Sequence, residues 1–172
     1  VLVDPNRLNY ALFNNIPGGT KVVQQVNPTI AMKAKKNDVE IRNIINAHKK
    51  DAVAMTKWMY WLKTNIGKIP MTEISASDYL EARRREQENF IDLSFTTISA
   101  YGANAAMMHY SATKESNAVL KPEGFLLVDS GGHYLEGTTD ITRTFALGAL
   151  TDEEKQHFTA CLLYTSPSPR DG

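Results

Sequence analysis

Residues 125–145 constrain the fold more than any other part of the chain. An apolar run over residues 125–128 leads directly to Asp129, and the pair Gly131-Gly132 then allows a tight turn. A second extended segment follows and begins near Asp140. This order of apolar run, glycines and second run predicts a β-hairpin with one aspartate on each strand.

Two carboxylates on adjacent antiparallel segments can converge on one hard cation. Oxygen ligands suit Mn, Mg and Ca, and they also bind Zn or Co. The alternative is two surface turn aspartates beside a Gly-Gly hairpin, which bind nothing, and the spacing alone favours this alternative. The hairpin alone leaves both interpretations open, so the remainder of the sequence has to distinguish them.

Composition narrows the class of protein. The 172 residues are 42% hydrophobic and 22% charged, which is typical of a globular protein, and the net charge is zero. A neutral chain gives no electrostatic argument for a nucleic-acid or membrane partner, and no apolar run is long enough to cross a bilayer. The single cysteine, Cys161, excludes an internal disulfide and fits a reducing compartment, so we expect a cytoplasmic protein.

A long helix is predicted over residues 38–64, with Asn37 or Asp38 as its cap. Apolar residues recur at three- and four-residue steps and should form the stripe that faces the core. We expect His48 to be a packed core histidine on this stripe. The stripe consists of Ile41, Ile44, Ile45, His48, Ala52, Met55, Met59, Leu62 and Ile66.

A second helix is predicted over residues 77–89, where Ser75 and Asp78 resemble a capping box. The run Arg83–Arg85 is flanked by Glu81, Glu86 and Glu88, which indicates a solvated helix face and not a nucleic-acid patch. A strand over residues 95–100 and a segment rich in Gly, Ala and Asn lead to His109. A final helix over residues 155–160 follows a Thr151/Glu154 capping box. These elements together predict an α+β fold with a mainly antiparallel sheet.

Several segments, in order, resemble one known family. Asp129-Ser-Gly, Tyr134 and Gly137-Thr-Thr-Asp140-Ile-Thr-Arg-Thr144 are similar to the metal-binding hairpin of Xaa-Pro aminopeptidase (aminopeptidase P), a branch of the pita-bread metallopeptidases. The upstream segments that also resemble it are Lys33–Asn37 with Glu40, Thr72-Glu73, Ser94-Phe95 with Ile98, and Gly102–Tyr110. The resemblance covers nearly all of residues 1–160.

The resemblance implies a role for three residues. Asp129 would be a terminal ligand of one metal ion, and Asp140 would bridge two divalent ions, for which Mn is expected and Zn or Co are alternatives. His109 would be a catalytic residue that contacts the substrate and steadies the tetrahedral intermediate. A metal-bridging hydroxide would attack the bond before a penultimate proline, because two cations lower the pKa of bound water. Tyr134 and Arg143 would be structural, with Arg143 paired to nearby carboxylates.

The same resemblance implies a domain organisation. Residues 1–27 would be the end of a creatinase-like N-terminal domain or a linker, and residues 28–160 would be the N-terminal half of a pita-bread domain. The family also needs one His and two Glu ligands downstream of the hairpin, so we expect the chain as written to be inactive alone. The complete protein would act on peptides with an Xaa-Pro N-terminus and form a homodimer.

Residues 161–171 break the resemblance. Pro167 and Pro169 would interrupt the helix that should continue there. The segment is similar to the translation of a transposase sequencing adapter. We therefore expect residues 161–172 to be a non-native tail, for which the alternative is a natural Ser/Pro-rich tail.

Three other interpretations remain open at this point. A prolidase-type Xaa-Pro dipeptidase would use the same hairpin. A catalytically dead pita-bread module that binds peptides or proteins would usually have lost the ligand aspartates, both of which are present here. The third is a metal-binding or structural fragment without peptidase descent.

Overall fold

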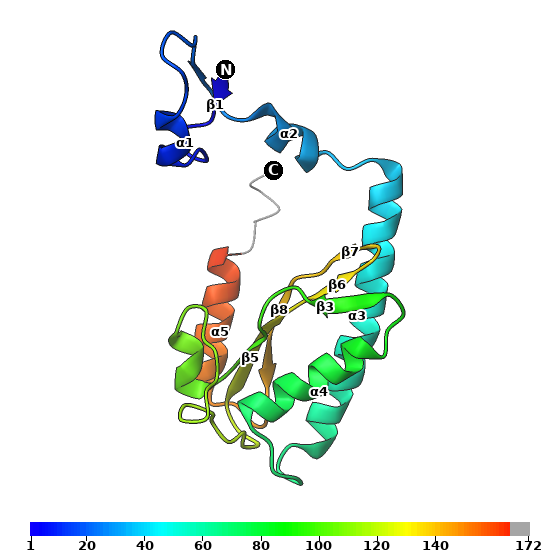
Figure 1. The fold of residues 1–172 in the computed structure, drawn as a ribbon. Helices are drawn as coiled ribbons and strands as arrows, with labels where there is room; N and C mark the ends of the chain where they lie inside the picture. Colours follow the sequence, from blue (N-terminus) through cyan, green and yellow to red (C-terminus); the bar gives the residue numbers. More distant parts are fainter. Residues whose placement is uncertain (166–172) are drawn as a thin grey trace. The chain divides into compact units, whose positions relative to one another are not determined.

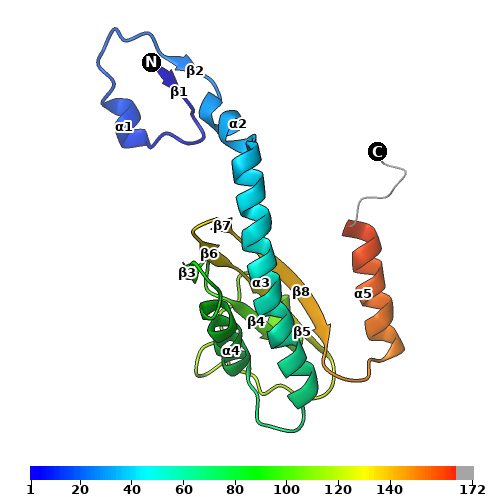
Figure 2. The same cartoon turned by 90° about the vertical axis from the view of Figure 1, so that its right-hand side faces the viewer.

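The computed structural model describes residues 1–165 and divides the chain into two compact units, one over residues 1–42 and one that begins at Asn43 (Figures 1 and 2). The first unit is small and mostly exposed. Its Asp4 carboxylate accepts hydrogen bonds from the backbone N–H of Asn6 (3.1 Å) and Asn27 (2.9 Å). Its elements are β1 (Leu2–Val3), α1 (Tyr10–Asn14), β2 (Val23–Gln24) and α2 (Pro28–Ala34), with β1 parallel to β2.

Helix α3 (Asp38–Asn65) confirms the predicted long helix, but its buried side differs from the predicted stripe. Ile41 is 45% exposed and Ile45 is 48% exposed, whereas Ala47 and Ala54 are completely buried. The small alanines face the core because they let the helix approach its neighbours closely. The prediction that His48 packs in the core is wrong, since its side chain is exposed and bonds to the Ile44 carbonyl of its own helix.

Helix α4 (Glu73–Arg85) begins earlier than predicted because its capping box is formed by Thr72 and Ser75, not by Ser75 and Asp78. The Ser75 N–H donates to Thr72 Oγ1 (3.1 Å), and the Thr72 N–H donates to Ser75 Oγ (2.8 Å). The helix also ends earlier than predicted, at Arg85 and not near Asn89. Asn89, with φ of 65°, then turns the chain into β3, a strand that the sequence patterns did not indicate.

Two three-stranded antiparallel sheets follow, in the orders β3-β6-β7 and β4-β5-β8. With the helices they confirm the predicted α+β fold with antiparallel sheets. The strands are β3 (Phe90–Leu93), β4 (Ile98–Tyr101), β5 (Phe125–Ser130), β6 (Gly132–Tyr134), β7 (Gly137–Thr138) and β8 (Ile141–Ala146), and the 3₁₀ helix η1 (Gly102–Ala106) follows β4.

Strands β5 to β8 form one long hairpin whose register is unchanged from end to end. Ser130 pairs with Ile141 near the middle, and Tyr134 pairs with Gly137 at the tip. The predicted turn at Gly131-Gly132 is therefore wrong. Gly131 is needed for a different reason: a Cβ there would lie 2.0 Å from the Thr139 carbonyl oxygen.

The core lies between the sheet and helices α3 and α4. Trp58 is fully buried, meets Phe145 edge-on with ring centroids 5.2 Å apart, and donates its indole N–H to the Ala76 carbonyl (2.8 Å). Trp61 stacks on Tyr79 at 4.0 Å. The two tryptophans thus pack α3 against its neighbours, while Tyr60 on the same helix is 72% exposed.

Helix α5 (Asp152–Thr165) starts at the predicted capping box, where Thr151 and Glu154 exchange hydrogen bonds. The helix includes residues 161–165, and residues 166–172 lie outside the part of the chain that the structure describes. The adapter origin of residues 161–172 stays a prediction. None of the helices within residues 1–165 combines the length and apolar character needed to cross a bilayer.

Candidate metal centre

Strand β5 places different chemistry on its two faces. Leu126, Val128 and Ser130 point to one side and are buried. Asp129 points to the other side, where it is half-buried. Its cross-strand neighbours are Ile98 on β4 and Thr142 on β8.

The register also places Asp140. This residue lies opposite Gly131, one position before β8 begins, because Ser130 pairs with Ile141 on one side and Thr139 bonds to Gly132 on the other. Alternate residues of a strand share a face, so Asp140 lies on the face of Thr142 and Asp129. The two aspartates are therefore diagonal neighbours, a separation that side chains can span. Asp140 is exposed.

The carboxylate of Asp129 has the chemistry of a cation ligand, because it offers two oxygens to a hard cation. Its Oδ1 atom is buried and has no hydrogen-bond partner within residues 1–165. An unpaired carboxylate oxygen in such a position is costly, and a bound cation would offset that cost. The residues present therefore fit a divalent metal ion, although they supply only part of its coordination. No group of three His, Cys, Asp or Glu residues that could hold a metal occurs in the described chain.

His109 lies in a separate loop that follows η1. Its side chain is exposed, and its backbone has φ of 54°, a left-handed conformation that few residues other than glycine adopt. No hydrogen bond within residues 1–165 joins its imidazole to either aspartate. The structure thus brings Asp129 and Asp140 to one face and places His109 on a loop of its own.

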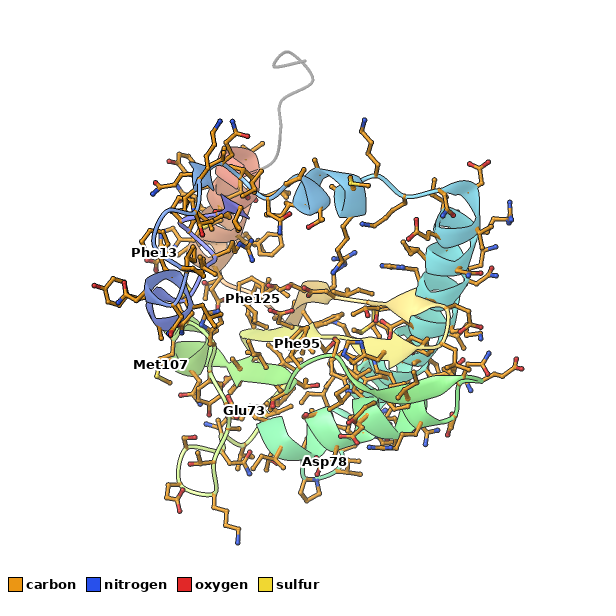
Figure 3. The ribbon with its side chains drawn as sticks, turned by 45° about the horizontal axis from the view of Figure 1, so that its top comes forward. Phe13, Glu73, Asp78, Phe95, Met107 and Phe125 are labelled. Carbon is orange, nitrogen blue, oxygen red and sulfur yellow. The ribbon has the colours of Figure 1, made fainter. Side chains whose placement is uncertain are left out.

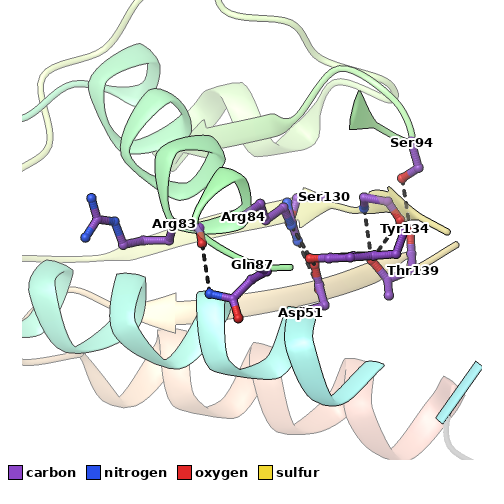
Figure 4. Close-up of polar contacts among 9 residues, drawn as sticks. Asp51, Arg83, Arg84, Gln87, Ser94, Ser130, Tyr134 and Thr139 are labelled. Atoms are coloured by element: carbon purple, nitrogen blue, oxygen red, sulfur yellow. Dashed lines mark hydrogen bonds and ion pairs between the residues drawn. The ribbon is translucent and has the colours of Figure 1, made fainter. Parts of the chain in front are cut away.

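A buried polar network lies behind the hairpin (Figure 4). Arg84 donates from Nε to Asp51 Oδ1 (2.7 Å) and from Nη2 to Asp51 Oδ2 (3.2 Å), and both side chains are completely buried. Arg84 Nη2 also donates to Ser130 Oγ (3.1 Å), and Tyr134 Oη donates to Asp51 Oδ1 (3.0 Å). The network therefore holds β5 one residue beyond Asp129.

The electrostatics of this network follow from burial. Burial raises the pKa of the Tyr134 phenol well above its ordinary value, and the nearby charge of Asp51 raises it further.

The prediction that Arg83–Arg85 form a solvated face is wrong for Arg84. Asp51 and Arg84 were missed by sequence reasoning. The available signal was helical spacing, because Asp51 lies between Ala47 and Met55 on the buried side of α3.

Thr139 fixes the chain just before Asp140. Its Oγ1 accepts from the Gly132 N–H (2.9 Å), and its carbonyl accepts from Ser94 Oγ (3.0 Å), as Figure 4 shows. The predicted pairing of Arg143 with carboxylates is wrong, because its guanidinium donates to the Thr142 carbonyl (2.7 Å) and makes no ion pair within residues 1–165. Both ends of the Asp129–Asp140 pair are thus held by groups on the buried side.

Known proteins resemble this chain over the part that contains the hairpin and the helices α3 to α5. The model of metallopeptidase family M24 matches residues 42–165. Xaa-Pro aminopeptidase ApepP of Drosophila melanogaster is 41% identical over 155 residues, which are 90% of this chain and 25% of the relative. The chain spans about a quarter of the length of the curated relatives it matches.

Solved structures share the fold. X-prolyl aminopeptidase from Caenorhabditis elegans, described as a cytosolic enzyme with a di-nuclear active site, is 34% identical with a TM-score of 0.71, over 77% of this chain and 22% of that one. The prolidase from Pyrococcus horikoshii OT3 has the same TM-score at 20% identity, over 94% of this chain and 45% of that one. The second likeness concerns the fold alone.

Proposed function

The chain belongs to metallopeptidase family M24, and from that premise we propose that the protein containing it is a metallo-aminopeptidase. It releases the N-terminal residue from peptides whose second residue is proline. One observation carries the proposal: Asp129 and Asp140 share one face of the hairpin, and Asp129 Oδ1 is buried without a partner. The curated relatives named as Xaa-Pro aminopeptidases, at about 40% identity, support the choice of substrate.

Asp129 and Asp140 hold two divalent metal ions in this proposal, with Mn expected and Zn or Co as alternatives. When bound, such ions lower the pKa of water and polarise a carbonyl. Carboxylates suit this task because each offers two oxygens to hard cations. The proposal requires one His and two Glu ligands besides these two aspartates, as the family resemblance implies.

His109 contacts the substrate in this proposal. Its imidazole forms no hydrogen bond within residues 1–165, so both ring nitrogens can bind an incoming group, one as a donor and one as an acceptor. We place the protein in the cytoplasm, as described for the Caenorhabditis elegans enzyme, and expect a homodimer.

A prolidase activity is the second candidate, because prolidases share this fold. The two activities differ in the substrate's length beyond proline. A dead binding module is disfavoured, because both ligand aspartates are retained.

The test uses the protein that carries this chain together with the remaining ligands. We expect Mn-dependent release of the first residue from an Xaa-Pro-Xaa peptide and little activity on the Xaa-Pro dipeptide. Asp140→Ala should abolish release, whereas Asp92→Asn, a change at an exposed aspartate, should not. Activity that survives Asp140→Ala, or equal cleavage of Xaa-Ala peptides, would refute the proposal. Preference for the dipeptide would favour prolidase.

A further inference from the structure

Glu73 is a completely buried carboxylate at the first position of α4. No lysine, arginine or histidine within residues 1–165 forms an ion pair with it. A buried anion without a cation is costly unless hydrogen bonds satisfy it. The positive end of the helix dipole favours a negative charge at this position and offsets part of that cost.

Four donor groups satisfy the Glu73 carboxylate, and all come from one stretch of chain. Oε1 accepts from the Tyr101 N–H (2.7 Å) and from Asn104 Nδ2 (3.0 Å). Oε2 accepts from Tyr110 Oη (2.7 Å), from the Ala118 N–H (2.9 Å) and from Asn104 Nδ2 (3.2 Å). Figure 3 labels Glu73 on α4 and Met107 in the segment that these groups belong to.

These contacts close the loop that carries His109. Tyr101 ends β4 at the start of the loop, Ala118 lies at its far end, and Asn104 and Tyr110 lie on either side of His109. Beyond η1, residues 107–118 form no helix and no strand of a sheet. Their other hydrogen bonds are either local, as between Thr113 and Ser116, or join the far end of the loop to the start of α4, as from the Ile74 N–H to Asn117 Oδ1. One carboxylate thus holds both ends and the middle of the loop.

His109 needs such support because its backbone is in the left-handed region, with φ of 54°. A conformation of this kind persists in a residue other than glycine only where the surroundings hold it. The next residue, Tyr110, is buried, and its hydroxyl bonds to Glu73. The contact therefore acts one residue away from the strained backbone.

We propose that Glu73 is the positioning residue for His109: its carboxylate holds the loop of residues 101–118 in the conformation that presents the imidazole. This inference rests on the proposed function for the role of His109, but the holding of the loop can be measured without activity. The site requires a carboxylate in particular. Both oxygens face backbone N–H donors, and a carboxylate is acceptor-only, whereas an amide would turn an N–H group toward one of them.

The first experiment measures amide hydrogen exchange by NMR on the chain as it stands. We expect Glu73→Gln to speed exchange about tenfold to a hundredfold at Tyr101 or Ala118, because one backbone donor loses its acceptor. The His109 imidazole signal should move toward its position in the unfolded chain. Exchange at Leu126 and Val128, in the core of β5, should not change. Glu81→Gln, on the exposed side of the same helix, is the matched control and should change nothing in the loop.

A milder variant guards against misfolding. Tyr110→Phe removes one donor and leaves the other bonds to Glu73 in place, so it should move the His109 signal in the same direction by less. If Glu73→Gln speeds exchange equally at Leu126 and Val128, Glu73 serves global stability and the proposal is overturned. Unchanged exchange throughout the loop would overturn it as well.

The second experiment uses the protein that carries the complete metal site. We expect Glu73→Gln to lower kcat at least tenfold with little change in KM or in bound Mn. Added to His109→Ala, the same change should have no further effect, because Glu73 acts through His109. A further loss in the double variant would contradict this inference. Full activity of His109→Ala would instead refute the catalytic role proposed for His109. The hydrogen-exchange result would still show whether Glu73 holds the loop.

Discussion

The two faces of strand β5 differ in whether the carboxylates beside them have hydrogen-bond partners. On the buried face, Ser130 accepts from Arg84, and Arg84 is paired with Asp51, so each oxygen of the Asp51 carboxylate has a partner. On the other face, one residue away, a buried oxygen of Asp129 has none within residues 1–165. One face of the strand therefore contacts a paired carboxylate that stabilises the fold, and the other carries the carboxylate that we propose as a metal ligand.

This contrast separates stability from function. A paired buried charge is costly to disrupt, because removing one partner leaves the other uncompensated. An unpaired carboxylate oxygen makes no hydrogen bond or ion pair that a substitution could remove. Substitutions on the two faces should therefore affect different properties. Those on the buried face should lower the stability of the fold, and those on the other face should weaken metal binding.

The largest effect is expected for Asp51→Asn, which leaves the buried Arg84 guanidinium without a counter-charge. We expect the free energy of unfolding to fall by about 3–5 kcal/mol, measured as a lower urea midpoint. The control is Glu86→Gln, which removes an exposed ion pair to Lys57 and Arg83 and should cost less than about 1 kcal/mol. Equal effects of the two variants would break the comparison.

Gly131→Ala should have the next largest effect. Its Cβ would lie 2.0 Å from the Thr139 carbonyl oxygen and 2.3 Å from Ser94 Oγ, so the two strands must separate beside Asp140. We expect a loss of about 1–3 kcal/mol, as for other overpacked sites. Gly18→Ala, where no atom lies within 4 Å of the added Cβ, is the matched control in the same denaturation assay. A loss of stability no greater than that of Gly18→Ala would show that the two strands can move apart here at little cost.

Tyr134→Phe removes a single hydrogen bond from the network, so we expect a loss of about 1 kcal/mol at neutral pH. The variant also tests the raised pKa. Burial, and then the Asp51 charge, keep the Tyr134 phenol protonated in the folded chain, while the unfolded chain ionises above about pH 10. The contribution of Tyr134 to stability should therefore be constant below that pH and be lost as the pH rises above it.

The slope of that fall provides the measurement. Urea midpoints between about pH 9 and pH 11 should decline more steeply for the native sequence than for Tyr134→Phe. Tyr110, whose pKa burial also raises, contributes to both curves and so cancels in the comparison. Parallel slopes would indicate that Tyr134 ionises alike in both states.

Sequence patterns predicted the parts of this molecule that depend on local chemistry. The apolar run that forms β5, the extent of α3 and the Thr151/Glu154 cap are local signals, and all three elements are present. The turn predicted at Gly131-Gly132 is absent, because Gly131 allows a close contact across the hairpin and the chain does not bend there. Local periodicity likewise cannot say which side of α3 meets the sheet.

The candidate site shows the same division. The family motif and the spacing singled out Asp129 and Asp140, whose shared face follows from strand register. Arg84 looked like one member of a charged run, and only its tertiary contact with Asp51 distinguishes it from Arg83 and Arg85. Long-range polar pairs of this kind leave no local pattern, since the two partners lie on different helices.

Asp129→Asn should have the smallest effect on stability, because the native oxygen that it alters has no partner to lose. Without metal, we expect its free energy of unfolding to be no lower than the native value, because the amide removes an unpaired buried charge. The matched substitution on the other face, Asp51→Asn, is the reference.

Thermal unfolding of the chain with increasing Mn²⁺ tests the central claim most directly. Ligands that bind only the folded state raise the melting temperature, and two carboxylates should bind Mn²⁺ weakly, at roughly millimolar concentration. We predict that millimolar Mn²⁺ raises the melting temperature of the native chain and of Asp92→Asn, and that Asp129→Asn and Asp140→Asn lose this rise while keeping their stability without metal. An equal rise in all four proteins, or a collapse of Asp129→Asn as large as that of Asp51→Asn, would contradict a metal site on the free face of β5.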